Sequence, residues 1–587
     1  MTMYRSEYPR PEFKREEWLS LNGQWDFCFP GEEMRKIEVP FVFQSEMSGI
    51  HENRMCDSVT YKRSFCVPDK WKGKRIRIHF GAVDYACSVF INEKKVGSHQ
   101  GGNTPFSFDI TEELTWKKEE ICVQVWDPCR DETIPRGKQF WKKDPDSIWY
   151  TRSTGIWQSV FIEPVSEVHF SYIRFTPDID RGTVEVKFKA AGLKEKIGGC
   201  HAEFAIIFKE REVFRGGMEL LEDYGRMEIS LFDRHIFRTM NHDGGWCWSP
   251  ESPNLFDVSA ALVKEGETID QVCTYFGMRK IEQKNGMVYL NNRPYYQKLI
   301  LDQGYWPGSL MTAQDEQDFV KDIEMAKAMG FNGCRKHQKA EDTVFLYYAD
   351  RIGFLVWSEI SACASYSLEA SQRTVTEWGE AIQRDYNHPC IVAWVVLNES
   401  WGVPNICFDK RQQAHSLALY YNAKSMDTTR LVISNDGWEI TKTDICAIHN
   451  YAHGEQSEPV KQEIFRKTLS TKEDILKAQP AGRQIYADGF GHQGEPVLLT
   501  EFGGLAYAKD REKGWGYTTI ENEEEFLEVY GRILKDIADS EILFGFCYTQ
   551  LCDVEQEVNG LLTYDRKYKV APEKIKAIND SVRKDYL

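Results

Sequence analysis

The hydrophobic pattern of this chain changes near residue 285, and that change constrains the fold more than any other feature of the sequence. Beyond it, segments with apolar residues at helical spacing alternate with short apolar segments typical of buried strands. EDTVFLYYADRIG (341–353) and TVTEWGEAIQRDYNHP (374–389) are predicted helices, and FLVWSE (354–359) is a predicted strand. Such alternation predicts parallel βα units. Because eight such units need about 250 residues, we predict that residues 281–587 form one (β/α)8 TIM barrel.

The residues before the barrel carry a different pattern. Short runs of alternating apolar and polar residues recur between turn signals, among them KRIRIHF (74–80) and EEICVQVWD (119–127). This pattern is typical of β-sandwiches, so we predict a jelly-roll β-sandwich over residues 1–165. The pattern continues from VHFSYIRFTPDI (168–179) over the length of an immunoglobulin domain, and we predict an immunoglobulin-like β-sandwich over residues 166–280.

Charge and composition argue against several classes of partner. The formal net charge is −17, and an acidic surface repels the phosphate backbone, so we expect no nucleic-acid partner. We find neither a signal peptide nor a long apolar span, so we expect a cytoplasmic protein without a membrane partner. The 16 cysteines form no CxxC pair and no HExxH motif occurs, so we expect free thiols, no metal site and no cofactor. The sequence leaves open whether the chain forms a homo-oligomer.

Three predicted barrel strands lead into a glutamate. FLVWSE ends at Glu359, IVAWVVLNE ends at Glu399, and PVLLTE ends at Glu501. The carboxyl ends of barrel strands open onto the active-site face, so these side chains are expected to converge there. A single carboxylate at a strand end commonly only accepts hydrogen bonds from the next loop. Several carboxylates in one pocket raise one another's pKa, a cost that is usual where acid–base chemistry occurs.

Paired carboxyl groups are the chemistry that cleavage of a glycosidic bond requires. One carboxyl protonates the leaving oxygen, while the other attacks the anomeric carbon or activates water. Separations of about 5–5.5 Å give retention of configuration, and about 6.5–9.5 Å gives inversion. Strands four and seven of a barrel are able to hold two carboxyls across its mouth at the shorter separation.

Two longer motifs surround Glu399 and Glu501. NHPCIVAWVVLNES (387–400) resembles the acid/base signature of family 2 glycoside hydrolases, the group that contains β-galactosidases, β-glucuronidases and β-mannosidases. EPVLLTEFGG (495–504) resembles the nucleophile signature of the same family. The resemblance covers nearly the whole chain, because residues 83–111 look like the family's sugar-binding jelly roll and residues 248–258 look like the end of its immunoglobulin-like domain.

The resemblance implies a retaining exo-β-glycosidase that removes terminal non-reducing β-hexopyranosides by double displacement. By similarity, Glu399 is the general acid/base, Glu501 is the nucleophile, and Asn398 hydrogen-bonds the sugar 2-hydroxyl. Glu359 is a further candidate to line the same pocket. A catalytically inactive carbohydrate-binding protein is the alternative from another class, and the presence of both glutamates argues against it. Either way, the expected partner is a carbohydrate.

The resemblance also implies substrate contacts for residues at other strand ends. Tyr451 matches a family tyrosine beside the nucleophile, with a core tyrosine as the alternative. His449 lies two residues earlier and is expected to face the same way. Asp302 matches an acidic residue after the first strand that binds sugar hydroxyls, and Tyr548 occupies the place of an aromatic residue after the eighth strand. Trp438 either stacks on the sugar or only lines a loop.

The identity of the sugar depends on two short segments. Family β-glucuronidases carry an Asn-x-Lys motif before the segment that matches GLLTYDR (560–566), whereas residues 557–559 here read EVN. In RKHQK (335–339), one interpretation is that Arg335 braces the nucleophile and the lysines are solvated. The other is that Arg335, His337 or Lys339 binds a substrate carboxylate. We favour a β-galactoside-type substrate, with a β-uronide, either a β-galacturonide or the substrate of an atypical β-glucuronidase, as the alternative.

Overall fold

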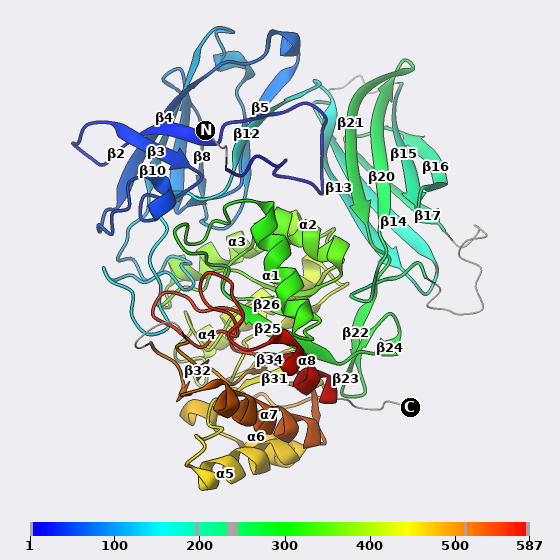
Figure 1. Cartoon of the computed structure of the whole chain (residues 1–587). Coiled ribbons are helices and arrows are strands. Elements are labelled where there is room, and N and C mark those ends of the chain that lie inside the picture. Colours follow the sequence, from blue (N-terminus) through cyan, green and yellow to red (C-terminus); the bar gives the residue numbers. More distant parts are fainter. Residues whose placement is uncertain (1–3, 194–198, 232–244, 510–513, 583–587) are drawn as a thin grey trace.

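The computed structural model describes residues 4–193, 199–231, 245–509 and 514–582. Buried apolar side chains gather in three separate cores, which belong to two β-sandwiches and a parallel barrel (Figure 1). Figure 1 shows the two sandwiches next to each other above the barrel. The predicted fold class, two β-sandwiches followed by a TIM barrel, is confirmed, while the exact domain limits stay predictions.

The first sandwich contains two main antiparallel sheets and a two-stranded pair of β6 with β11. Its strands are β1 (Leu19–Ser20), β2 (Gly23–Cys28), β3 (Arg35–Val39), β4 (Ser58–Phe65), β5 (Arg75–Phe80), β6 (Val83–Asp84), β7 (Ala86–Ile91), β8 (Lys94–Gln100), β9 (Phe106–Asp109), β10 (Glu119–Trp126), β11 (Gly155–Ile156) and β12 (Val160–Val165). One sheet has the order β3-β2-β4-β10-β7-β8 and the other the order β1-β12-β5-β9. Buried and more exposed side chains alternate along β10, as expected for a strand with one face on the core.

The second sandwich is smaller. Its strands are β13 (His169–Asp178), β14 (Thr183–Ala191), β15 (Cys200–Phe208), β16 (Arg211–Glu219), β17 (Tyr224–Ser230), β18 (Trp248–Ser249), β19 (Ser252–Pro253), β20 (Phe256–Lys264) and β21 (Glu267–Phe276). The sheets have the orders β13-β14-β17 and β16-β15-β20-β21. Phe276 stacks on both Phe175 and Phe256 in the core between them, with ring centroids 5.0 Å apart in each case.

The barrel follows a small three-stranded sheet of β22 (Ile281–Lys284), β23 (Met287–Leu290) and β24 (Arg293–Pro294). Its strands are β25 (Gln297–Asp302), β26 (Gly333–Lys336), β27 (Leu355–Glu359), β28 (Ile391–Val395), β29 (Leu431–Ile433), β30 (Cys446–His449), β31 (Val497–Glu501) and β34 (Leu543–Tyr548), with β32 (Leu505–Ala506) and β33 (Thr518–Thr519) paired outside it. They form a nearly closed parallel sheet in the order β29-β28-β27-β26-β25-β34-β31-β30. A bridge between Gly437 and Ile448 lies at the seam.

Helices surround the barrel strands. They are α1 (Glu316–Ala328), α2 (Thr343–Ile352), α3 (Leu368–Asp385), α4 (Lys410–Met426), α5 (Pro459–Ser470), α6 (Lys472–Lys477), α7 (Glu523–Asp539) and α8 (Pro572–Ser581). Asp315 and Asp342 cap α1 and α2 by accepting hydrogen bonds from backbone N–H groups of the first turn, and Gly353 ends α2 with a φ of 80°. Among the described residues, no helix has the length and apolar character needed to cross a membrane.

Two segments of the first sandwich contact the other domains, one the second sandwich and the other the barrel. The N-terminal segment carries Arg15, which pairs with Asp270 of β21 at 3.0 Å and with Glu163 of β12 at 3.1 Å. The cyan segment between β10 and β11, which we call the sandwich loop (residues 127–154), leaves the sandwich and lies against the barrel (Figure 1). The sandwich loop therefore brings residues of the first domain to the barrel mouth.

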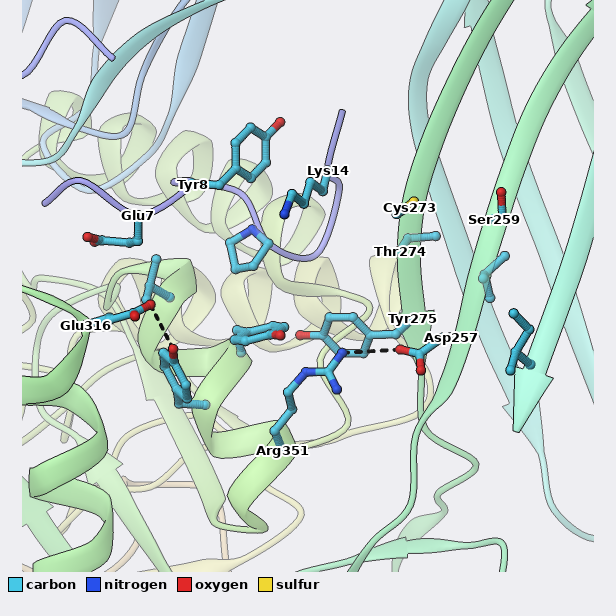
Figure 2. Close-up of a pocket in the computed structure, with 16 residues that line it drawn as sticks. Glu7, Tyr8, Lys14, Asp257, Ser259, Cys273, Thr274, Tyr275, Glu316 and Arg351 are labelled. Carbon is cyan, nitrogen blue, oxygen red and sulfur yellow. Dashed lines mark hydrogen bonds and ion pairs between the residues drawn. The ribbon is translucent and has the colours of Figure 1, made fainter. Parts of the chain in front are cut away.

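A cavity of about 450 Å³ lies where the N-terminal segment, β20, β21 and α2 meet (Figure 2). Arg351 of α2 pairs with Asp257 of β20 at 3.2 Å, and Tyr348 donates a hydrogen bond of 2.7 Å to Glu316 (Figure 2). Neither predicted catalytic glutamate lines this cavity. It is a junction between domains and is separate from the site described next.

Candidate active site

Glu399 and Glu501 meet at the mouth of the barrel. Glu501 ends β31 as predicted, whereas β28 ends at Val395, and Glu399 lies in the loop that follows. Glu399 has a positive φ of 51°, a conformation that non-glycine residues seldom adopt outside turns and functional sites. One carboxylate oxygen of each glutamate and one ring nitrogen of His449 all lie within 4.8 Å of one another.

His449 lies between the two carboxylates. Its Nδ1 is 2.9 Å from Glu399 Oε1 and 3.5 Å from Glu501 Oε2, and its Nε2 is 3.0 Å from Asp436 Oδ1. Burial alone would lower the pKa of His449, but Glu501 and Asp436 outweigh it and raise that pKa to about 10. The imidazolium in turn outweighs burial and lowers the pKa of Glu399 through their hydrogen bond.

Arg335 of β26 braces this cluster from below and is fully buried. Its guanidinium forms ion pairs with Glu359 at 2.6 Å, Asp436 at 3.1 Å and Glu501 at 3.0 Å. It also donates a hydrogen bond of 2.8 Å to Asn398 Oδ1. All three guanidinium nitrogens are therefore engaged by the protein, which leaves Arg335 unsuited to bind a substrate carboxylate.

The opposite side of Glu501 is held by tyrosines. Tyr451 donates a hydrogen bond of 2.7 Å to Glu501 Oε2, and its hydroxyl lies 2.9 Å from Thr549 Oγ1. The ring of Tyr451 stacks on Tyr517 with centroids 3.6 Å apart. Burial and the neighbouring Glu501 raise the pKa of Tyr451 well above its usual value, so this phenol stays a hydrogen-bond donor.

Three polar groups around the carboxylates have no protein partner among the described residues. Asn398 uses its carbonyl oxygen on Arg335, and its Nδ2 is not hydrogen-bonded. The His337 ring uses Nδ1 on Arg335 and Glu359, and its Nε2 is not hydrogen-bonded. The Trp438 indole N–H is buried without an acceptor, and its ring lies 5.7 Å from that of His449. These groups are placed to receive a polar ligand.

The structure places Lys339 and Asp302 in a different cluster. The Lys339 ammonium donates to Gly304 O and Met311 O, each at 2.7 Å, and to Glu341 at 3.0 Å. Lys336, in turn, pairs with Asp302 at 2.6 Å. All three Lys339 donors are used and both predicted residues are about 2% exposed, so the predicted substrate contacts of Lys339 and Asp302 do not fit their positions.

Glu359 and Tyr548 also serve the framework rather than the pocket. Glu359 accepts from Arg335 and from the Gln338 backbone N–H and also pairs with His337 Nδ1 at 3.2 Å, so three protein groups surround a carboxylate that is only 1% exposed. Tyr548 is fully buried, and its ring packs 5.6 Å from Phe502 and 5.1 Å from Tyr530 of α7. Successive residues of a strand face opposite sides, so Tyr548 points to the helix layer. The predicted substrate contacts of Glu359 and Tyr548 therefore do not fit either.

Sequence reasoning missed several residues of the cluster. Asp436 follows β29 in the segment LVISND, so an acidic residue near a strand end is the only signal that this segment contains. Thr549 follows Tyr548 and faces Tyr451 instead. Tyr150 of the sandwich loop donates a hydrogen bond to Glu557 of the barrel, and Lys138 lies under Tyr150 with its ammonium 5.6 Å from the ring centroid. No local pattern predicts these contacts between domains.

Family models match most of the chain. The sugar-binding domain of glycosyl hydrolases family 2 matches residues 37–162, and the TIM-barrel domain of that family matches residues 281–583. A third model of the same family matches residues 239–279. The barrel match alone spans more than half of the chain.

The individual relatives share less than a third of their aligned residues with this chain. A β-galactosidase of Thermoanaerobacter pseudethanolicus is 28% identical over 68% of this chain and 53% of its own length. A β-galactosidase of Priestia megaterium is 25% identical over 72% of this chain and 41% of its own length. The chain thus spans about half the length of these curated relatives.

Solved structures share the fold over the whole chain. A β-galacturonidase from Eisenbergiella tayi has a TM-score of 0.74 at 20% identity and covers 100% of this chain and 99% of its own. The β-glucuronidase of Bifidobacterium dentium has a TM-score of 0.77 at 19% identity and covers 99% of each chain. Taken with the family models, these findings establish that the chain belongs to family 2 of the glycosyl hydrolases.

Proposed function

We propose that the chain is a retaining exo-β-glycosidase in which Glu501 is the nucleophile and Glu399 the general acid/base. The observation that carries this proposal is the separation of the two carboxylates, which approach within 4.8 Å. Retaining glycosidases hold the pair about 5–5.5 Å apart, whereas inverting ones need about 6.5–9.5 Å for an intervening water. The two glutamates leave no room for that water.

The surroundings of Glu501 suit a nucleophile. Arg335 pairs with Oε1 and Tyr451 donates to Oε2, so contacts on both carboxylate oxygens hold the group in one orientation. In the first step, a Glu501 oxygen bonds to the anomeric carbon while the bond to the leaving oxygen breaks and its electron pair departs with that oxygen. The resulting ester removes one negative charge from the cluster.

Glu399 and His449 together hold the proton that the leaving oxygen needs. The pKa of His449 is raised to about 10 and the pKa of Glu399 is lowered, so one proton is shared across their 2.9 Å hydrogen bond. Glu399 delivers this proton to the leaving group. It then accepts a proton from water, whose oxygen attacks the anomeric carbon and displaces Glu501.

The unpartnered polar groups are proposed to bind the sugar. The Asn398 amide, the His337 Nε2 and the Trp438 indole N–H surround the carboxylates and suit hydroxyl groups. The Glu399 and Glu501 side chains are only 16% and 6% exposed, which fits a pocket for the end of a saccharide. A cytoplasmic location stays a prediction of the sequence, and the oligomeric state stays open.

A β-galactoside-type sugar remains our preferred substrate. Arg335 and Lys339, two of the three residues that the uronide alternative names, are both engaged by the protein, which leaves His337 as its remaining candidate in that segment. The cluster also contains five carboxylates, those of Glu359, Glu399, Asp436, Glu501 and Glu557, which disfavours a further negative charge. The uronide alternative is supported by one remaining cation, Lys138, whose ammonium has no ion pair among the described residues.

Glu501→Gln and Glu399→Ala test the assignment on an aryl β-galactoside. Loss of the nucleophile is expected to lower kcat by about 10⁴-fold or more, because the paired groups act as a unit. Sodium azide is expected to restore turnover of Glu399→Ala on a substrate with a good leaving group, and to give a β-glycosyl azide. Glu524→Gln, an exposed glutamate of α7, is the matched control. Near-normal turnover by Glu501→Gln would contradict the proposal.

A further inference from the structure

The sandwich loop is fixed to the barrel next to the candidate active site. The backbone N–H groups of Arg136 and Gly137 both donate to Ala362 O in the loop after β27, at 3.1 and 3.0 Å. A Cβ atom on Gly137 would lie 2.3 Å from the carbonyl oxygen of Gln338, the neighbour of His337. The backbone next to Lys138 therefore packs closely against the loops that follow strands β26 and β27.

The other end of the sandwich loop lies above both functional sides of the pocket. The Trp149 ring packs 4.8 Å from Trp401, two residues beyond Glu399. Tyr150, the next residue, donates to Glu557 in the segment after β34. Lys138 lies beneath both aromatic rings, with its ammonium 5.6 Å from each centroid. Lys138 thus sits between the acid/base side of the pocket and Glu557.

Lys138 is a buried cation without a salt-bridge partner. The residue is only 7% exposed, and its ammonium forms no ion pair or hydrogen bond with any residue that the structure describes. Burial raises the pKa of Glu557, the charge of Lys138 is the largest influence that opposes this, and both groups contact Tyr150. The ammonium nitrogen is not among the fully buried unpartnered atoms, so it keeps contact with open space and is able to donate to a ligand.

Glu557 supplies complementary acceptors. Its Oε2 accepts from Tyr150 and its Oε1 accepts from Asn559 Nδ2 at 2.9 Å. Asn559 accepts from Gln550, which accepts from Gln303, so a chain of amides fixes the carboxylate. Each carboxylate oxygen has a second lone pair, which leaves acceptor capacity towards the pocket. A fixed acceptor and a free donor therefore both lie next to Tyr150.

We propose that Lys138 and Glu557 together bind hydroxyl groups of the non-reducing sugar and select a neutral hexopyranoside over a uronide. A hydroxyl donates and accepts at once, so it satisfies a lysine and a glutamate at the same time. A uronide carboxylate would satisfy Lys138 but would meet Glu557 as a like charge. This inference rests on the proposed glycosidase function and assigns a specificity role to a residue outside the barrel.

The test measures kcat/KM on aryl β-galactoside and aryl β-galacturonide for the wild type, Lys138→Met and Glu557→Gln. We expect the wild type to prefer the galactoside. Lys138→Met should lower kcat/KM on the galactoside by about 10- to 100-fold, the usual effect of a lost hydrogen bond to a charged group. Glu557→Gln should reduce the preference for the neutral sugar at least about tenfold. Lys143→Met, an exposed lysine of the same loop, is the matched control.

Deoxy sugars test the contact by removing the hydroxyl group from the substrate as well as the ammonium from the protein. Wild-type kcat/KM should fall on the 4-deoxy or the 6-deoxy galactoside, and Lys138→Met should lose little more on that same substrate, because both changes remove one interaction. Additive losses at both positions would overturn the inference, as would a wild type that prefers the galacturonide. If the wild type cleaves no β-glycoside of the panel, the proposed function itself fails. If it cleaves them but Lys138→Met equals Lys143→Met, only the present inference fails.

Discussion

His449 sets the proton balance between the two glutamates. It is an imidazolium that contacts both carboxylates and Asp436. Without this cation, two carboxylates within 4.8 Å would repel each other, and one would take up a proton to relieve the repulsion. The histidine thus keeps a proton available beside Glu399.

His449→Gln should change the pH dependence of kcat/KM, which reports the free enzyme. In the wild type, the shared proton is lost only as the pH approaches the His449 pKa of about 10. In the variant, only the Glu399 carboxyl is left to hold this proton, so we expect the basic limb to move to lower pH by at least about one unit. A pH–rate profile on an aryl β-galactoside measures this shift. An unchanged basic limb would show that His449 does not share the catalytic proton.

The residues whose position at the barrel mouth can be predicted from sequence are those whose place depends on the local chain. Glu501 ends an apolar strand, and Glu399 belongs to a long motif, so strand direction alone brings both to the barrel mouth. Lys339 and Tyr548 also lie near strand ends, but their side chains depend on partners elsewhere. Glu341 captures the Lys339 ammonium, and α7 packs on Tyr548. Spacing along one segment does not encode those competing contacts.

Helix boundaries also depend on contacts that the hydrophobic pattern does not reveal. The predicted helix over 374–389 begins instead at Leu368, because Ser367 caps it by accepting from the Ala370 N–H. Leu368 is 74% exposed, so the first turn carries no apolar periodicity from which it could be predicted. The sandwich loop was missed for a related reason, since its contacts lie in another domain.

Substitution of Gly137 tests whether the position of the sandwich loop matters for activity. It has a φ of 58°, and an added methyl group would clash with the Gln338 backbone. Gly137→Ala should shift the loop and lower kcat/KM at least about tenfold, as misplacement of a substrate-binding group by about 1 Å does. Thermal unfolding should change by only a few degrees. Steady-state kinetics and a melting curve measure both.

Gly31→Ala is the control for that variant. Gly31 belongs to the same sandwich and also has a positive φ, 76°, but an added Cβ would meet no atom within 4 Å. It therefore carries the backbone strain without the clash. Equal activity of the two variants would show that the loop tolerates displacement.

At the scale of the whole molecule, Arg15 holds the two sandwiches together. It is buried and pairs with Glu163 of one sandwich and Asp270 of the other. Removal of one partner from a buried ion pair costs about 3–5 kcal/mol. We therefore expect Arg15→Met to lower the midpoint of the first unfolding transition in urea, followed by intrinsic fluorescence.

Arg10→Met is the comparison for this prediction. Arg10 lies on the same N-terminal segment, is 29% exposed in its side chain, and pairs with Glu12 only at 3.9 Å. A pair of this kind contributes about 0–1 kcal/mol. Matching midpoints for the two variants would mean that Arg15 does not join the sandwiches energetically.

Because the sandwich loop reaches the barrel, the reaction chemistry and the choice of sugar depend on residues in different parts of the sequence. The residues proposed to break and form bonds lie on strands and loops of the barrel, whereas Lys138, which we propose to bind the sugar, comes from a distant N-terminal stretch. Mutations in that stretch are able to alter which saccharide is accepted and leave the reaction centre intact. New preferences are thus accessible in evolution or by grafting of residues 127–154, without a redesign of the chemistry.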